Sequence, residues 1–269
     1  MDAISNFAAR YVRLREEEMS IDEYLALCQR DPMAYGSAAQ RMLTAIGEPE
    51  MVDTRSDPHL SRLFANKVIR RYPAFAEFYG MEDAIDQVVS FFRHAAQGLE
   101  ERKQILYLLG PVGGGKSSIA ERLKYLMQKV PFYALKGSPV NESPLGLFDV
   151  AEDGPVLEEQ FGIPRRYLQH VLSPWAVKRL EEYGGDIRQF RVVKRYPSIL
   201  RQVAVAKTEP GDENNQDISS LVGKVDIRKL ENFAQDDTDA YSYSGGLCLA
   251  NQGLLEFVEM FKAPIKVLH

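Results

Sequence analysis

Residues 110–118 have the types and spacing that bind phosphate. They carry the pattern G-x-x-x-x-G-K-S, read in order as Gly110, Pro111, Val112, Gly113, Gly114, Gly115, Lys116, Ser117 and Ser118. Glycines let a backbone turn tightly and direct its N–H groups inward, where they surround an anion. We expect Lys116 to reach the β- and γ-phosphates and to act in catalysis, and Ser117 to offer its hydroxyl to Mg²⁺. The nine residues are therefore the predicted phosphate-binding loop for a nucleoside triphosphate with Mg²⁺.

The segments on either side of this loop fit the same interpretation. The apolar run at residues 105–109 predicts a buried strand that ends where the loop begins. After the loop, Ile119, Leu123 and Met127 recur at the four-residue spacing of a helix. The N-terminus of that helix would add partial positive charge where the phosphates bind.

A nucleoside triphosphatase also needs a second strand that ends in acidic residues, one for the metal and one for the attacking water. Residues 254–259 are apolar and end in Glu259, which is the candidate catalytic base. Val258 stands where the first acid is expected, and Glu256, about 6.6 Å back on the same strand face, is the candidate metal ligand. An alternative register places Ala250 and Asn251 at these positions. The first register is preferred because it retains an acid.

Tyr79 and Gly80 precede an amphipathic helix predicted over residues 82–99. In many ATPases of the AAA+ class, a glycine-containing turn before this helix packs against adenine, so both residues are candidate nucleotide contacts. The alternative is a hydrophobic staple at the start of the helix.

Composition limits the class of protein. The 269 residues are 45% hydrophobic and 26% charged, as in ordinary soluble domains, and the formal net charge of -5 argues against a nucleic-acid partner. No apolar run reaches the ~18–20 residues of a membrane span. Cys28 and Cys248 are far apart and form no metal-binding or disulfide pattern. We expect a cytoplasmic protein.

The chain is predicted to contain a helical region over residues 1–70 and an α/β nucleotide-binding core over residues 71–269. Ser20 and Glu23 form a capping box for a helix that stops at Asp31, and a second helix ends at Gly47. The acidic run at residues 16–18 is expected on a solvated helix face. Residues 47–75 are expected to be loop-rich with a short helix over residues 60–69, and residues 131–135 and 190–194 to be strands.

Several long strings in the sequence resemble the PrkA family, whose members are AAA-type serine protein kinases of bacteria. These strings are residues 71–75 (RYPAF), 78–81 (FYGM), 110–118, 137–141 (GSPVN), 209–217 (EPGDENNQD), and the stretch from 250–253 (ANQG) through 262–264 (KAP). The resemblance implies a P-loop AAA+ fold, with a parallel sheet flanked by helices and an N-terminal helical extension. It also implies a full-length protein that acts on protein substrates, forms homo-oligomers and carries a kinase-like region beyond this chain.

The resemblance also implies that the chain is C-terminally truncated, because the helical lid and the arginine finger of an AAA+ ATPase would follow His269. The leading functional prediction is the ATP-binding module of a serine/threonine protein kinase in a bacterial stress response. One alternative is an AAA+ motor for protein remodelling or proteolysis. Another is a nucleotide-gated scaffold without turnover, which Val258 favours.

Overall fold

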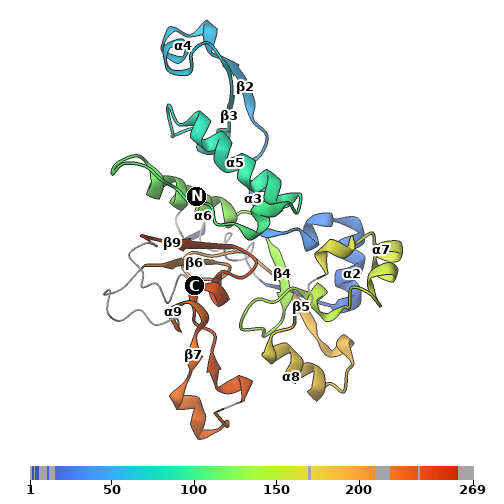
Figure 1. Cartoon of the computed structure of the whole chain (residues 1–269). Coiled ribbons are helices and arrows are strands. Elements are labelled where there is room, and N and C mark those ends of the chain that lie inside the picture. The colour runs from blue at the N-terminus through green and yellow to red at the C-terminus, as the bar shows by residue number, and fades with distance from the viewer. Residues whose placement is uncertain are drawn as a thin grey trace. The chain divides into compact units, whose positions relative to one another are not determined.

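The computed structural model of the chain describes residues 2, 4–5, 11, 16–168, 171–209, 219–235 and 237–259. The chain forms two compact units, one of residues 36–130 and one of residues 1–35 together with 131–269 (Figure 1). The boundary expected at residue 70 does not coincide with this division. It lies within a strand pair, since residues 50–53 bond to residues 68–71.

The longest helices of the unit of residues 36–130 are α3 (Ala38–Ile46), α5 (Glu82–Ala96) and α6 (Lys116–Met127). α3 lies against both α5 and α6. α6 buries one apolar side, made of Ile119, Leu123, Leu126 and Met127. Full burial of a side chain of this size stabilises the fold by ~1.5–3 kcal/mol, so these contacts fix α6 and with it the loop that precedes it.

The remaining elements of this unit lie between α3 and α5, or follow α5. They are β2 (Glu50–Asp53), η2 (Thr54–Ser56), α4 (Pro58–Phe64), β3 (Val68–Arg71), η3 (Pro73–Phe75) and η4 (Glu100–Lys103). The helix expected over residues 60–69 stops at Phe64, because Ala65 and Asn66 take left-handed φ angles of 50° and 62° and reverse the chain. Val68 and Ile69 then pair with β2 in an antiparallel hairpin.

The other unit is built on the sheet β1-β5-β4, made of β1 (Glu17–Ser20), β5 (Arg191–Arg195) and β4 (Phe132–Leu135), with both pairings antiparallel. Its helices and turns are α2 (Ile21–Arg30), η1 (Pro32–Tyr35), η5 (Pro144–Leu147), α7 (Gly154–Phe161), η6 (Arg165–Tyr167), α8 (Pro174–Glu182) and η7 (Ile187–Gln189). The predicted capping box is confirmed, because Glu23 N donates to Ser20 Oγ and Ser20 N donates to Glu23 Oε2. The prediction that Glu17 and Glu18 lie on a helix is wrong. They lie in β1, where basic residues face them across the sheet.

A parallel pair follows in the same unit, formed by β6 (Val205–Thr208) and β9 (Leu254–Phe257). The short helix α10 (Gly246–Ala250) precedes β9. Gly253 lies between α10 and β9. It is so close to the backbone of Ala204 that an added Cβ would be 1.6 Å from the Ala204 carbonyl oxygen. The apolar cluster of Phe132, Ala134, Val193 and Ala204 joins the sheet to the start of β6.

Between β6 and α10 the chain forms an insert, drawn in orange in Figure 1. Its elements are α9 (Ser219–Val222), β7 (Lys224–Val225), η8 (Ile227–Glu231), η9 (Thr238–Ala240) and β8 (Tyr241–Ser242). Two residues of α8 hold it by ion pairs. Lys178 Nζ lies 2.8 Å from Asp237 Oδ1 and 2.6 Å from Asp239 Oδ2, and Arg179 Nη2 lies 3.0 Å from Asp239 Oδ1. These four residues are called the insert ion cluster.

The strand expected at residues 105–109 is not formed. Its backbone is irregular, and the side chains of Ile105 and Leu109 are 73% and 83% exposed. An apolar run becomes a strand only when a neighbouring strand completes its hydrogen bonds, and the described strands of residues 36–130 pair only with each other, as β2 with β3. The expected parallel sheet is likewise represented, among the described residues, by the single pair β6–β9. Residues 210–217 and 262–264 of the family-like strings lie outside the described residues.

Candidate functional site

The backbone of the predicted phosphate loop turns at its glycines. Gly113 and Gly115 have φ angles of 80° and 77°, which side-chain-bearing residues rarely adopt. Gly114 N donates a 3.1 Å hydrogen bond to Pro111 O, and a Cβ added at Gly114 would lie 3.1 Å from that oxygen. The tight turn therefore requires glycine at these positions.

Lys116 begins α6 and folds back over the loop. Its Nζ donates hydrogen bonds of 2.8 Å to Gly110 O and 2.6 Å to Pro111 O. Both acceptors are neutral carbonyl groups, so the ammonium charge is not balanced by these two contacts. A phosphate group offers a stronger, charge-assisted hydrogen bond to the same donor.

The N-terminus of α6 presents further donors. Gly115 is its N-cap and no side chain caps it, so the first backbone N–H groups of the helix have no side-chain acceptor. Ser117 and Ser118 lie in this first turn, and both are exposed. A helix of this length with an uncapped start attracts negative charge through its dipole.

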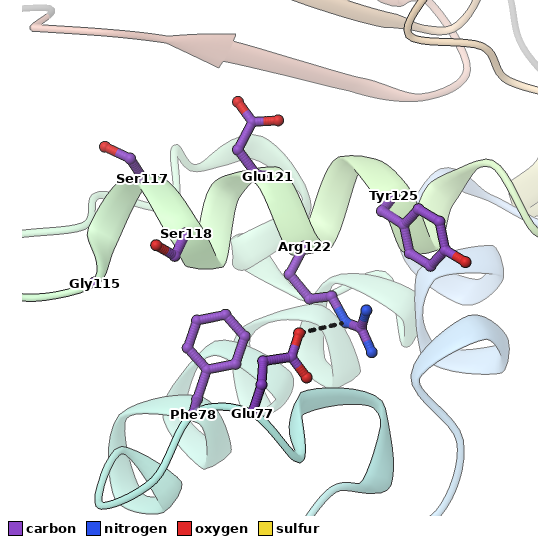
Figure 2. Close-up of a pocket in the computed structure, with 8 residues that line it drawn as sticks. All are labelled: Glu77, Phe78, Gly115, Ser117, Ser118, Glu121, Arg122 and Tyr125. Atoms are coloured by element: carbon purple, nitrogen blue, oxygen red, sulfur yellow. Dashed lines mark ion pairs between the residues drawn. The ribbon is translucent and has the colours of Figure 1, made fainter.

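A cavity of about 630 Å³ lies beside this turn. Its lining comes from the segment before α5 and from α6: Glu77, Phe78, Gly115, Ser117, Ser118, Glu121, Arg122 and Tyr125. Figure 2 shows Ser118 and Arg122 extending from α6 toward Phe78 and Glu77, whereas Ser117 and Glu121 extend from the other side of the helix. The aromatic rings of Phe78 and Tyr125 give the cavity an apolar part that suits a planar, uncharged group.

Arg122 joins the two walls of the cavity. Its Nε donates a 2.5 Å hydrogen bond to Ala74 O and lies 3.3 Å from Glu77 Oε1. Its guanidinium also lies 5.4 Å from the centre of the Tyr125 ring. Sequence reasoning missed Glu77, Arg122 and Tyr125. The spacing of Arg122 and Tyr125 from Ser118 along one helix face is the signal that could have found those two.

The predicted adenine contacts lie next to this cavity without lining it. The Tyr79 side chain is 87% exposed, and a Cβ added at Gly80, whose φ is 76°, would lie 3.3 Å from Leu63. Met81, the next residue, reaches the loop: its Sδ lies 3.1 Å from the position of a Cβ on Gly115. The turn before α5 is therefore adjacent to the phosphate loop, and Phe78 is the residue of the turn that faces the cavity.

The candidate acids belong to the other unit. Glu256 lies in β9 opposite Lys207 of β6, and Glu259 is exposed in the turn after β9, with a φ of 50°. Residues 246–250 are helical, so the strand of this region is the one predicted by the preferred register. Asn251 donates from Nδ2 to Val140 O at 2.7 Å instead of ending a strand.

The donor set of the loop fits a nucleoside triphosphate with Mg²⁺. The backbone N–H groups of the left-handed glycines and of the uncapped helix start, with the ammonium of Lys116, are groups that can donate hydrogen bonds to phosphate. Within the part of the chain that the structure describes, no three His, Cys, Asp or Glu side chains lie close enough to hold a metal by themselves. Mg²⁺ at nucleotide sites needs only one or two protein ligands, because phosphates and waters complete its shell.

Comparisons with known proteins show the family of the chain. A model of the family described as the PrkA AAA domain matches residues 19–269. The chain is 66% identical over 273 residues to the serine/threonine kinase YeaG of Escherichia coli strain K12, which covers 100% of the chain and 42% of that protein. It is 32% identical over 276 residues to the ATP-dependent protease PrkA of Bacillus subtilis strain 168, covering 95% of the chain and 41% of that protein. No solved structure matches the chain.

These findings define the chain as an AAA-type domain of mixed helices and strands. More particularly, the chain belongs to the PrkA family, as its sequence strings predicted. It spans about two fifths of the length of the curated relatives it matches. Among the described residues, no helix is long and apolar enough to cross a membrane.

Proposed function

We propose that the chain is the ATP-binding module of a PrkA-like serine/threonine protein kinase and couples its nucleotide state to activity on protein substrates. One observation carries the proposal. The Lys116 ammonium is held at the mouth of a glycine loop by two neutral carbonyls, next to a helix N-terminus that no side chain caps. This arrangement suits the phosphates of a nucleotide, and the AAA-type family implies such a ligand.

The phosphates and the base would occupy different parts of the site. The cavity beside α6 is lined by two acids, Glu77 and Glu121, and one cation, Arg122. It therefore suits an uncharged base better than a phosphate chain. We assign the phosphates to residues 110–118 and the adenine to the cavity, where Phe78 supplies an aromatic face, with Tyr79 and Gly80 shaping the turn beside it.

Four residues would carry the chemistry. Lys116 balances negative charge on the phosphates, and Glu259 accepts a proton from the attacking group. Ser117 would hold Mg²⁺, with Glu256 as its partner ligand, and when bound the ion neutralises phosphate charge. The strand at Leu254–Phe257 supports this choice, because it leads directly to Glu259.

Two other functions remain open for the full-length protein. The B. subtilis relative is named an ATP-dependent protease, which supports an AAA+ motor that acts on protein chains. Val258, in place of the expected strand-end acid, supports a nucleotide-gated scaffold. The kinase is preferred because the relative named a kinase is 66% identical to this chain. In each case we expect a cytoplasmic homo-oligomer with no nucleic-acid partner.

The full-length protein incubated with γ-labelled ATP and candidate substrates tests the proposal. A kinase places label on serine or threonine, whereas a motor releases labelled phosphate and, if proteolytic, shortens the substrate. A scaffold binds ATP and does neither. Lys116→Ala should abolish whichever reaction occurs, and Lys103→Ala, which removes an exposed lysine of η4, should not. Label on protein that persists in Lys116→Ala would refute the assignment.

A further inference from the structure

Two of the family-like strings meet in the structure, although neither belongs to the phosphate loop. Residues 137–141 follow β4, and residues 250–253 precede β9. Gln252 Nε2 donates hydrogen bonds of 2.9 Å to Tyr133 O and 2.7 Å to Asn141 O, and Asn251 Nδ2 donates to Val140 O. Two consecutive side-chain amides thus connect the segment before β9 to β4 and to the loop that follows β4.

The Gln252 amide occupies a defined place on the sheet. β4 is an edge strand in the order β1-β5-β4. Along an edge, alternate residues direct their N–H and C=O groups away from the paired neighbour. Tyr133 O accepts from Gln252 and Leu135 N donates to Glu142 O, two residues further along. The glutamine therefore completes a hydrogen bond at the open edge of β4.

The loop that receives this amide is itself fixed. Asn141 is buried, has a left-handed φ of 50°, and accepts a 2.6 Å hydrogen bond on Oδ1 from Arg195 of β5. Glu142 accepts from both the backbone N and the Oγ of Ser173, the N-cap of α8. A side chain that bonds to this loop is consequently held in a fixed place relative to the sheet and to α8.

The backbone of Gln252 indicates that its side chain is required. Its φ of 59° is left-handed, a conformation that glycine adopts freely and other residues adopt at a cost of ~1 kcal/mol or more. Glycine already occupies the next position, 253. A glutamine at a position better suited to glycine is explained by the two hydrogen bonds that only its side chain makes.

We propose that Gln252 is a positioning residue that sets where β9 starts, and through β9 where Glu256 and Glu259 are held. Leu254, two residues after Gln252, donates from its N to Ala204 O, so the strand begins its pairing with β6 close to this contact. The functional part of the inference rests on the proposed roles of Glu256 and Glu259. The structural part stands on the contacts alone.

Two substitutions in the full-length protein test it. Gln252→Met keeps the length of the side chain and removes the amide, whereas Gln252→Gly removes the amide and also relieves the left-handed backbone. If the methionine variant folds poorly, the glycine variant still reports on the amide. Gln189→Met is the matched control, because Gln189 is an exposed glutamine of the same unit that donates to a backbone carbonyl.

Three measurements decide the outcome: deuterium uptake of residues 254–258, ATP affinity and turnover. We expect both Gln252 variants to exchange about 5-fold faster or more in this segment. Turnover should fall about 10-fold or more, since small displacements of reacting groups are costly, with ATP affinity at saturating Mg²⁺ and the control unchanged. The inference would be overturned by unchanged uptake or by faster uptake with wild-type turnover. It would also be overturned by a loss of ATP affinity as large as the loss of turnover. If the wild-type protein itself shows no turnover, the proposed function fails, and uptake alone decides whether Gln252 positions β9.

Discussion

Lys116→Ala removes the single side-chain charge of the phosphate loop, residues 110–118. In the structure its ammonium donates to Gly110 O and Pro111 O, while the apolar side of α6 is formed by other residues. The substitution therefore separates phosphate binding from folding. We expect ATP affinity to fall sharply and the fold to persist.

The size of both effects follows from the contacts. A charge-assisted hydrogen bond to phosphate contributes about 2–3 kcal/mol, which corresponds to a loss of roughly 30- to 150-fold in affinity. Part of this binding free energy is offset in the wild type, because Lys116 must break its hydrogen bonds to two carbonyl groups before it can bond to phosphate. Those carbonyls lie in an exposed loop and can bond to water in the variant, so the free energy of unfolding should change by about 1 kcal/mol or less.

Titration calorimetry with ATP and Mg²⁺ measures the affinity, and thermal melts followed by circular dichroism measure the fold. Lys103→Ala is the control for loss of one positive charge. A folded Lys116→Ala variant with wild-type affinity would show that the loop does not bind the phosphates. A variant that fails to fold would show that Lys116 acts mainly on stability.

Four further predictions concern the other unit. Glu259→Gln in the full-length protein should keep ATP affinity and lose turnover, because an amide cannot accept the proton; wild-type turnover in this variant would show that Glu259 is not the base. Glu256→Gln should raise the Mg²⁺ concentration needed for the same ATP affinity in a metal titration, and an unchanged requirement would contradict its role. Gly253→Ala should cost more than about 3 kcal/mol in denaturant unfolding, since its Cβ would overlap a backbone carbonyl, and a smaller loss would mean that β9 can shift. Burial raises the pKa of Glu142, so the free energy of unfolding should fall as pH rises from the ordinary glutamate range through that raised pKa, and Glu142→Gln should flatten this decline in melts across pH.

Local signals in the sequence predicted many of the elements. The capping box at Ser20 and Glu23, the stop at Gly47 and the helix after the phosphate loop are all confirmed. These features depend on hydrogen bonds within a few residues, so the sequence contains what is needed to place them. The strand at Leu254–Phe257 was likewise found from its apolar run.

Features that depend on distant partners were harder to predict. The apolar run at residues 105–109 signals burial but does not specify a neighbouring strand, and in the structure it is irregular. Arg122 looked like one of several helix cations, and only its contacts with Ala74 and Glu77, more than 40 residues away, place it at the cavity. The role of the Gln252 amide could not be predicted for the same reason, because its acceptor is a carbonyl 119 residues away in the sequence.

The insert ion cluster gives the protein a part whose stability depends on ionic strength. Its ion pairs, which join Lys178 and Arg179 to Asp237 and Asp239, are partly exposed. Dissolved salt weakens exposed ion pairs, because the Debye length falls from about 8 Å at physiological concentration as salt is added. The apolar contacts that hold the sheet β1-β5-β4 and its helices are not weakened in this way. Salt should therefore loosen the attachment of the insert to α8 before it disturbs the sheet, so that the local ionic environment adjusts one segment of the unit while the rest keeps its structure.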